Sequence, residues 1–342
     1  MRELSAGSMI SHSRRCYLHI GVPKTGTTML QKFLYQHRAA LRARGLLYPE
    51  VSLRGYGHHD IAFMVSDAYP EWATRPSQSL SMDMLAAQLH EAVSEYDGDV
   101  LLSSENFYLY PDPKRLQVFL YQAGLGRHEI LPIVYLRRQD EAIDSWYNQA
   151  IKAQGATEGV ADFVRRWDGL WDYEAQLGQW AATFGKGALC VRAYDPRRFG
   201  TTPLLDDFFG VTGTPINDLA APAERVNAGL NREMVEFQRL LNALPLTPQD
   251  KRLFHHKLID LSVGTEGSGL FDEGPLLDAD CRKAIMDRYR AGNAAVTASY
   301  LAGDAFLLDE GLPAAGAARS AEGLSTETLA RIMGWLMIKA ER

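Results

Sequence analysis

The chain has 342 residues, of which 46% are hydrophobic and 23% charged, and these proportions are typical of a globular protein rather than a disordered, fibrous or membrane protein. The formal net charge of −6 at pH 7 argues against a surface that coats nucleic acid, because such surfaces usually carry an excess of lysine and arginine. An anionic ligand therefore needs a local concentration of positive charge within an acidic protein.

The scattered cysteines and the lack of long apolar runs indicate the cellular compartment. Cys16, Cys190 and Cys281 are odd in number and lack the spacing of a metal site or a disulfide framework. The N-terminal residues contain no uninterrupted apolar stretch like that of a secretory signal, and no segment approaches the roughly 18 apolar residues that span a bilayer. We therefore expect a cytoplasmic protein with no membrane span.

The first predicted unit is a strand, a tight loop and a helix. Residues 16–20 form a short, mostly apolar run, and the loop 21–28 follows it. After the loop, four apolar residues share one helical face, and Gly45 is placed to end that helix. These four residues are Leu30, Phe33, Leu34 and Leu41.

Two further helix and strand units follow. A helix with apolar positions from Met82 to Val93 leads into a strand at 99–103. Residues 130–136 form a continuous apolar run, typical of a strand that is covered on both faces. This run leads into a helix that begins near Asp140, its expected N-cap, and ends before Gly155. Its expected buried residues are Ile143, Trp146 and Ala150.

Alternating strands and helices predict an α/β fold with a central, mostly parallel sheet flanked by helices. Residues 188–193 add a further strand, and the pattern after residue 214 is mainly helical. We expect one domain over residues 14–309, with its α/β core at 14–213 and a helical completion at 214–309. Ligands of such sheets bind at the carboxyl ends of the strands.

The C-terminal residues 310–342 form a predicted tail. Residues 311–323 are rich in alanine and glycine, which is typical of a linker. A last amphipathic helix is predicted at 325–339, with Ser325 as its cap.

The loop after the first strand has the chemistry of an anion site. A loop that opens a helix presents backbone N–H groups and the positive end of the helix dipole to an anion. Gly21 and Gly26 allow close backbone approach, Lys24 adds a full charge, and Thr27 and Thr28 add hydroxyls. A Walker A loop has its lysine directly after the second glycine, where this chain has Thr27. A P-loop kinase also needs a carboxylate for Mg²⁺, for which Glu105 is the candidate.

The segment Gly-Val-Pro-Lys-Thr-Gly-Thr-Thr closely resembles the 5′-phosphosulfate loop of sulfotransferases that use 3′-phosphoadenosine 5′-phosphosulfate (PAPS). By this resemblance Lys24 contacts the bridging oxygen of the phosphosulfate, and Thr27 and Thr28 bind the 5′-phosphate. The donor-binding loop would then consist of Pro23, Lys24, Thr25, Gly26, Thr27 and Thr28.

A second segment is similar to the 3′-phosphate site of the same family. In that site an arginine ends an apolar strand and a serine follows eight residues later, and Arg137 and Ser145 have this spacing. Side chains of a helix lean toward its N-terminus, so Ser145 can point back at the strand end. A charge-assisted hydrogen bond of about 1.5–3 kcal/mol from Arg137 would select the doubly phosphorylated nucleotide.

Further similarity to the family extends over most of residues 16–305. Residues 191–195 and 204–210 are similar to its last strand, turn and closing helix, which would put Tyr194 near the adenine. Met29 stands where many members have tryptophan. The Arg-Lys-Gly segment of cytosolic members is not found, and Arg225 and Asn227 are the candidates for its role.

Three residues are candidates for the general base that accepts the acceptor proton. Glu105 is the favoured candidate, because it follows the strand at 99–103, where cytosolic sulfotransferases carry a catalytic histidine. His58 and His59 are the rivals, because an imidazole exchanges protons near neutral pH. At most one of two adjacent histidines faces a site if the backbone is extended. The pair His255 and His256 lacks a supporting motif and is assigned to surface or packing.

The resemblance implies sulfuryl transfer from PAPS to a hydroxyl or amine of a glycan, a lipid-linked sugar or a small metabolite, with release of 3′,5′-adenosine bisphosphate. No metal is expected, because a sulfonate carries less charge than a γ-phosphate and no cluster of metal ligands is visible. The alternatives are an ATP-dependent P-loop kinase and a non-catalytic nucleotide-binding protein. The acceptor loops are expected at 53–80, 106–125 and 155–175, and the sequence leaves the acceptor and the oligomeric state open.

Overall fold

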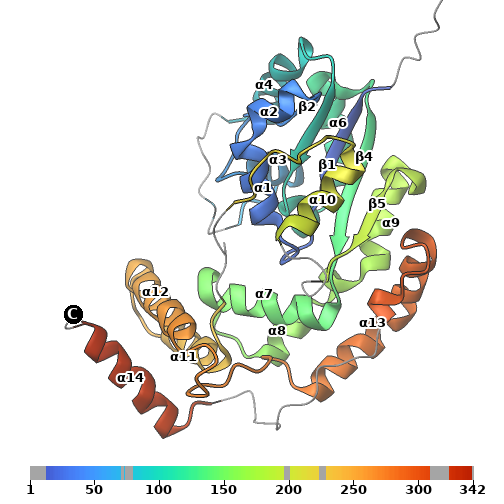
Figure 1. Cartoon of the computed structure of the whole chain (residues 1–342). Coiled ribbons are helices and arrows are strands. Elements are labelled where there is room, and N and C mark those ends of the chain that lie inside the picture. Colours follow the sequence, from blue (N-terminus) through green and yellow to red (C-terminus); the bar gives the residue numbers. More distant parts are fainter. Residues whose placement is uncertain are drawn as a thin grey trace, which may run out of the picture.

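The computed structural model describes residues 13–70, 73, 80–195, 201–222, 229–308 and 323–340. Its centre is a five-stranded, all-parallel sheet with the strand order β2-β3-β1-β4-β5 (Figure 1). The strands are β1 (Arg15–His19), β2 (Leu46–Leu47), β3 (Asp99–Ser103), β4 (Glu129–Leu136) and β5 (Cys190–Ala193). The predicted α/β fold with a central parallel sheet flanked by helices is confirmed.

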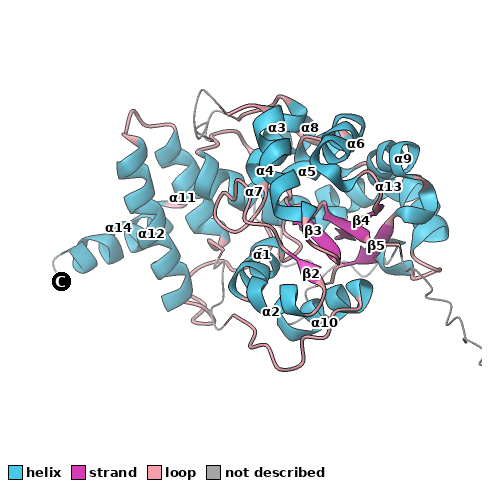
Figure 2. Cartoon of the chain, turned by 90° about the horizontal axis from the view of Figure 1, so that it is seen from above, coloured by secondary structure: helices cyan, strands magenta, loops and turns pink. Residues whose placement is uncertain are grey.

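Helices cover both faces of the sheet (Figure 2). Those before β4 are α1 (Thr27–Gln36), α2 (Arg38–Ala43), α3 (His59–Ser66), α4 (Met82–Ser94), α5 (Asn106–Leu109) and α6 (Pro113–Leu120). Those after β4 are α7 (Gln139–Gln154), α8 (Val160–Arg166), α9 (Tyr173–Phe184), α10 (Thr201–Thr212), α11 (Arg232–Asn242), α12 (Pro248–Gly264), α13 (Ala279–Tyr300) and α14 (Thr326–Ala340). None of these helices, within the described residues, is both long and apolar enough to cross a membrane.

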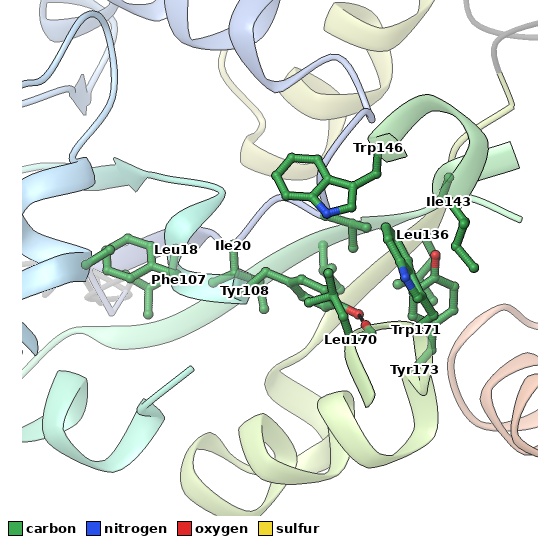
Figure 3. Packing of buried hydrophobic residues seen from close by; sticks show 14 of the residues in the cluster. Leu18, Ile20, Phe107, Tyr108, Leu136, Ile143, Trp146, Leu170, Trp171 and Tyr173 are labelled. Carbon is green, nitrogen blue, oxygen red and sulfur yellow. Dashed lines mark hydrogen bonds between the residues drawn. The ribbon is translucent and has the colours of Figure 1, made fainter. Parts of the chain in front are cut away.

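Successive side chains of a strand point to opposite faces of the sheet. Both sets are apolar here, because helices cover both faces. One face contributes to a smaller core with Phe33 of α1 and Phe208 of α10, through Tyr17, Leu101 and Tyr135. The other face contributes to a larger core with α3 to α9 and the C-terminal helices, through Leu18, Leu102 and Leu136. Figure 3 shows part of the larger core, in which Leu136 lies near Ile143 and Trp171.

The first helix is shorter than the sequence predicts. Leu30, Phe33, Leu34 and Leu41 are all buried, as expected, but the helix breaks at His37 into α1 and α2. Gly45 follows α2 with φ +89° and leads into β2, a two-residue edge strand that the apolar pattern did not predict.

Asp140 is not the N-cap of α7, because that position is held by Arg138. The Asp140 carboxylate is fully buried and instead accepts from Arg138 Nε at 3.2 Å and from Arg282 Nη2 of α13 at 2.7 Å. Gln139 and Asn293 add a second buried link, with Gln139 Nε2 donating to Asn293 Oδ1 at 2.6 Å. Helix α13 is therefore fixed to the start of α7, and the expected end of α7 at Gly155, with φ +72°, is confirmed.

Helices α11, α12 and α14 gather beside the α/β core (Figures 1 and 2). The expected helical pattern after residue 214 is confirmed for the described residues. Ser325 Oγ accepts from Thr328 N at 3.0 Å, which is the predicted cap of α14. The expected linker at 311–323 lies, apart from Gly323, outside the described residues.

We predict that Asp140→Ala lowers the free energy of unfolding by about 3–5 kcal/mol, because it leaves two buried guanidinium groups without their shared partner. Urea unfolding measures the change. Asp287→Ala is the matched control, since it removes an exposed carboxylate that pairs with Lys283 and Arg290 on α13. Equal urea midpoints for the two variants would contradict a supporting role for Asp140.

Candidate active site

A cleft of about 1330 Å³ opens at the carboxyl ends of β1, β3, β4 and β5. It brings together ten residues that the sequence proposes for the site, from elements far apart in the chain. They are Pro23, Lys24, Gly26, Thr27, Thr28, His59, Glu105, Arg137, Ser145 and Tyr194. Thr25 and His58 do not line the cleft, and Arg225 and Asn227 lie outside the described residues.

The loop between β1 and α1 has the conformation of an anion cradle. Lys24 and Gly26 both have positive φ, at +69° and +79°. Thr25 is buried, and its Oγ1 donates to Val22 O at 2.7 Å, so this hydroxyl holds the loop's shape instead of facing the cleft. Thr27 begins α1, so the N–H groups of the first helical turn point toward the cleft mouth.

Gly26 is required by space as well as by φ. A Cβ at this position would lie 2.5 Å from Leu204 Cδ2 of α10 and 3.6 Å from Tyr194 Cε2. The loop therefore passes tightly under Tyr194, whose pKa is raised by burial. Tyr194, which the resemblance would put near the adenine, and Met29 both line the cleft.

Lys24 carries a partly buried ammonium group with a weak partner. Its Nζ donates to Gln149 Oε1 of α7 at 3.5 Å, and no carboxylate among the described residues forms an ion pair with it. Burial lowers the pKa of Lys24 to about 8, and the charges of Lys152 and Arg137 lower it in the same direction. Such a group gains more than an exposed lysine when an anion binds beside it.

Arg137 and Ser145 lie in the same cleft as the loop. Arg137 Nη1 donates to Lys24 O at 3.2 Å, and its Nε donates to Glu141 Oε2 at 3.3 Å. Tyr173 OH donates to Arg137 O at 2.6 Å and fixes the end of β4. The two predicted phosphate contacts are therefore neighbours, because β4 lies next to β1 in the sheet.

The cleft carries more positive than negative side chains although the whole chain has a net charge of −6. The cationic residues on its lining are Lys24, Arg54, Arg137, Lys152, Arg166, Arg252 and Arg282. The carboxylates on its lining are Glu105, Glu141, Asp144 and Glu158. This is the local concentration of positive charge that an anionic ligand needs in an acidic protein.

His58 and His59 have different surroundings. His58 is fully buried, accepts from Ser103 N through Nδ1 at 3.1 Å and faces Pro49 O through Nε2 at 2.9 Å. Burial lowers the pKa of His58 to about 4, so its imidazole stays neutral near pH 7. Its two ring nitrogens connect the end of β3 with the backbone at Pro49. His59, the first residue of α3, lines the cleft instead.

His59 and Glu105 form a pair at the cleft wall. His59 Nδ1 lies 2.7 Å from Ser104 Oγ, 3.0 Å from Asn106 Nδ2 and 3.7 Å from Glu105 Oε2. Its Nε2 has no hydrogen-bond partner among the described residues. The pair can therefore exchange a proton with a ligand in the cleft while its other atoms are held in place.

The network behind this pair was missed in the sequence. Gln31 Nε2 of α1 donates to Glu105 Oε2 at 3.0 Å and lies 3.3 Å from Ser103 Oγ. Ser103 Oγ is also 2.8 Å from His19 Nδ1, in line with the pairing of these two residues across β1 and β3. Burial lowers the pKa of His19 to about 4. The available signal was a polar residue at the end of each of two strands, His19 and Ser103, and the polar run that follows Ser103.

No group of three or more His, Cys, Asp or Glu side chains is placed to hold a metal ion within the part of the chain that the structure describes. The residues of the three expected acceptor loops that line the cleft include Arg54, Tyr110 and Trp167.

Comparison with known proteins gives distant similarities. No family model matches the chain. An uncharacterized protein of Archaeoglobus fulgidus is 26% identical over 169 residues, which are 49% of this chain and 45% of that protein, so the match spans about half of its length. A solved sulfotransferase from Alicyclobacillus acidocaldarius is similar with a TM-score of 0.46 and 14% identity, over 84% of this chain and 96% of that one. The sulfotransferase domain from the curacin biosynthetic pathway is similar with a TM-score of 0.36 and 12% identity, over 82% of this chain and 98% of that one. We therefore infer function from the geometry of the cleft.

We predict that Gly26→Ala lowers the free energy of unfolding by about 1–2 kcal/mol, because an L-residue is disfavoured at this φ, and that the contact with Leu204 adds to the loss. Gly178→Ala is the matched control, because this exposed glycine lies inside α9 with open space around it. The control should gain about 0.5–1 kcal/mol. Urea unfolding of both variants measures this, and a stable Gly26→Ala protein would show that the loop is not constrained.

Proposed function

We propose that the chain is a sulfotransferase that moves the sulfuryl group of PAPS to an acceptor hydroxyl or amine. The observation that carries the proposal is the contact between Arg137 Nη1 and Lys24 O, which makes two anion sites neighbours in one cleft. PAPS carries two separate anionic groups on one nucleoside, and the two sites are suited to hold one each.

The lysine position favours PAPS over ATP. Thr27 stands where a P-loop kinase has its lysine, and Lys24 instead lies at the turn, where its ammonium faces the cleft. Among the carboxylates of the cleft, Glu105 is the residue that could serve Mg²⁺, but it accepts from Gln31 and lies beside His59. The site is therefore better suited to metal-free transfer of a monoanionic group.

Lys24 and the loop would stabilise the leaving group. The acceptor oxygen or nitrogen attacks sulfur, the bond from sulfur to the bridging oxygen breaks, and that oxygen leaves with the electron pair as part of 3′,5′-adenosine bisphosphate. The ammonium group of Lys24 is placed to offset the charge that grows on the bridging oxygen, as required for transfer of this type. Its partly buried position strengthens this effect, because water screens it less.

His59 is the proposed general base, with Glu105 as the group that orients it. For Nε2 to take the acceptor proton, the neutral His59 ring must carry its own proton on Nδ1, from which it can be donated to Ser104 Oγ at 2.7 Å. The carboxylate of Glu105 lies 3.7 Å from Nδ1 and would help to orient the ring. His58, which is neutral and enclosed, is left with a structural role.

We predict that 3′,5′-adenosine bisphosphate without magnesium stabilises the protein, whereas ATP with magnesium does so weakly. A ligand at about 100 times its dissociation constant adds roughly 2.7 kcal/mol to the free energy of unfolding. Thermal melting measures both ligands. The reverse order would favour the kinase, and no response to either nucleotide would contradict the proposal.

We predict that His59→Ala lowers kcat for sulfate transfer by about 10²–10⁴-fold and leaves binding of 3′,5′-adenosine bisphosphate unchanged. Glu105→Gln should give a smaller loss, because its role passes through His59. Glu91→Gln, on the exposed side of α4, is the matched control and should keep full activity. Steady-state kinetics with radiolabelled PAPS measure the three variants, and a larger loss in Glu105→Gln than in His59→Ala would contradict the assignment of the proton to His59.

A further inference from the structure

Helix α14 lies at the edge of the molecule, beside α11 and α12 (Figures 1 and 2). Its inner face is buried at three positions that are spaced four residues apart. These positions are Thr328, Ile332 and Leu336. Thr328 Oγ1 donates to Glu233 Oε1 of α11 at 2.8 Å. The contacts of the inner face fix the rotation of α14 about its axis, and they therefore decide which residues point outward.

The outer face of α14 is apolar as well. Ala330 and Gly334 lie exposed on it, and a Cβ at Gly334 would meet nothing within 4 Å. The charged residues among the described side chains of α14 are Glu327 and Arg331, which pair with each other at 2.6 Å. A helix that is apolar all round is usually buried, but the described part of the chain leaves this face uncovered. The large apolar side chains that α14 exposes are Leu329, Met333, Met337 and Ile338.

The order of large and small residues on this face fits a second copy of the same face. Ala330 and Met337 are seven residues apart, so they lie on one side of the helix, and their midpoint falls between Met333 and Gly334. In an antiparallel pair of helices with a two-fold axis at this midpoint, Met337 of each copy faces Ala330 of the other. A large side chain then meets a small one, and Gly334, next to the axis, lets the two backbones approach closely. The opposed dipoles of antiparallel helices also favour this arrangement.

The charge of α14 argues against a membrane as the occupant of this face. Helices that lie on a membrane surface usually carry several lysines and arginines beside their apolar face. Residues 326–338 have one such cation, Arg331, and it pairs with Glu327. The net charge of −6 adds repulsion from anionic headgroups. A second copy of the chain needs no excess of positive charge.

We infer that α14 is a dimer interface, in which two copies of this chain pair in antiparallel orientation about a two-fold axis near Met333 and Gly334. Two helices of about 22 Å in length cover less than the roughly 800 Å² per partner of a standard interface. Leu270, which is exposed and whose carbonyl oxygen accepts from Arg331 Nη1 at 3.0 Å, extends the apolar surface beside the helix. We therefore expect a dimer that dissociates reversibly. The inference does not depend on the proposed function, because no residue of α14 lines the cleft.

Sedimentation velocity of the full chain, from about 1 to 100 µM, tests whether it dimerises through α14. We expect a shift from monomer to dimer as the concentration rises. Met337→Lys should raise the dissociation constant at least about tenfold, because it places an ammonium group against Ala330 in an apolar interface. Met84→Lys, the same change at an exposed methionine of α4, is the matched control and should leave the dissociation constant unchanged. Urea unfolding confirms that both variants fold.

Cross-linking of introduced cysteines with a short bismaleimide tests the orientation. Met333→Cys brings the new thiols of the two copies close to the axis, so this variant should form covalent dimers. Thr326→Cys, exposed at the start of α14, should not, because the two copies of this residue are about 22 Å apart along an antiparallel pair. The unchanged chain, with its three native cysteines, gives the background.

Three results would overturn the inference: a chain that stays monomeric over the whole range, a dimer that Met337→Lys does not weaken, or equal cross-linking of the two cysteine variants. Monomers that bind phosphatidylcholine vesicles, and lose this binding in Met337→Lys, would instead identify a membrane as the occupant. All these measurements are made without nucleotide, so failure of the proposed function would leave them unchanged.

Discussion

The hydrogen bond from Arg137 to the carbonyl oxygen of Lys24 is the interaction on which the site depends. It joins the end of β4 to the loop after β1, and it exists because these two strands are adjacent in the sheet. Tyr173 holds Arg137 from behind, and the tight passage of Gly26 under Tyr194 holds the loop. Two positive groups that would repel each other are thus kept side by side, and this arrangement is favourable mainly when an anion lies between or beside them.

The helical part of the chain maintains this arrangement at a distance. Asp140 connects Arg138, next to Arg137, with Arg282 of α13, so the C-terminal helices fix the start of α7. Helix α7 then carries Ser145, Gln149 and Lys152 along the cleft. A helix held at its first turn and closed by Gly155 is a rigid support, on which the proposed nucleotide contact of Ser145 and the contact of Gln149 to Lys24 keep their spacing.

Much of this fold could be predicted because its strands are apolar runs and its loop residues have distinct roles. The runs at 99–103 and 130–136 are buried on both faces, and this composition is typical of parallel strands. The pair Arg137 and Ser145 was proposed from its similarity to the 3′-phosphate site of PAPS-dependent sulfotransferases, and both residues line the cleft. Asp140 was assigned wrongly, because a carboxylate at a helix start usually caps it, and only the fold brings Arg282 from 142 residues away.

The missed part of the site consists of contacts between distant elements. Nothing in the pair His58 and His59 tells which one faces the sheet, since this depends on how α3 meets β3. His19 and Gln31 join Ser103 and Glu105 only because β1, α1 and β3 converge at the same edge. Such long-range pairs follow from topology, and the sequence pattern reports only local periodicity.

The most direct test of the shared nucleotide is the affinity of Arg137→Ala for two nucleotides that differ by one phosphate. If Arg137 binds the 3′-phosphate while the loop binds the 5′-phosphate, this variant should lose at least about tenfold in affinity for 3′,5′-adenosine bisphosphate and almost none for 5′-AMP. Calorimetry gives both constants. Equal losses for the two nucleotides, or no loss for either, would contradict the account.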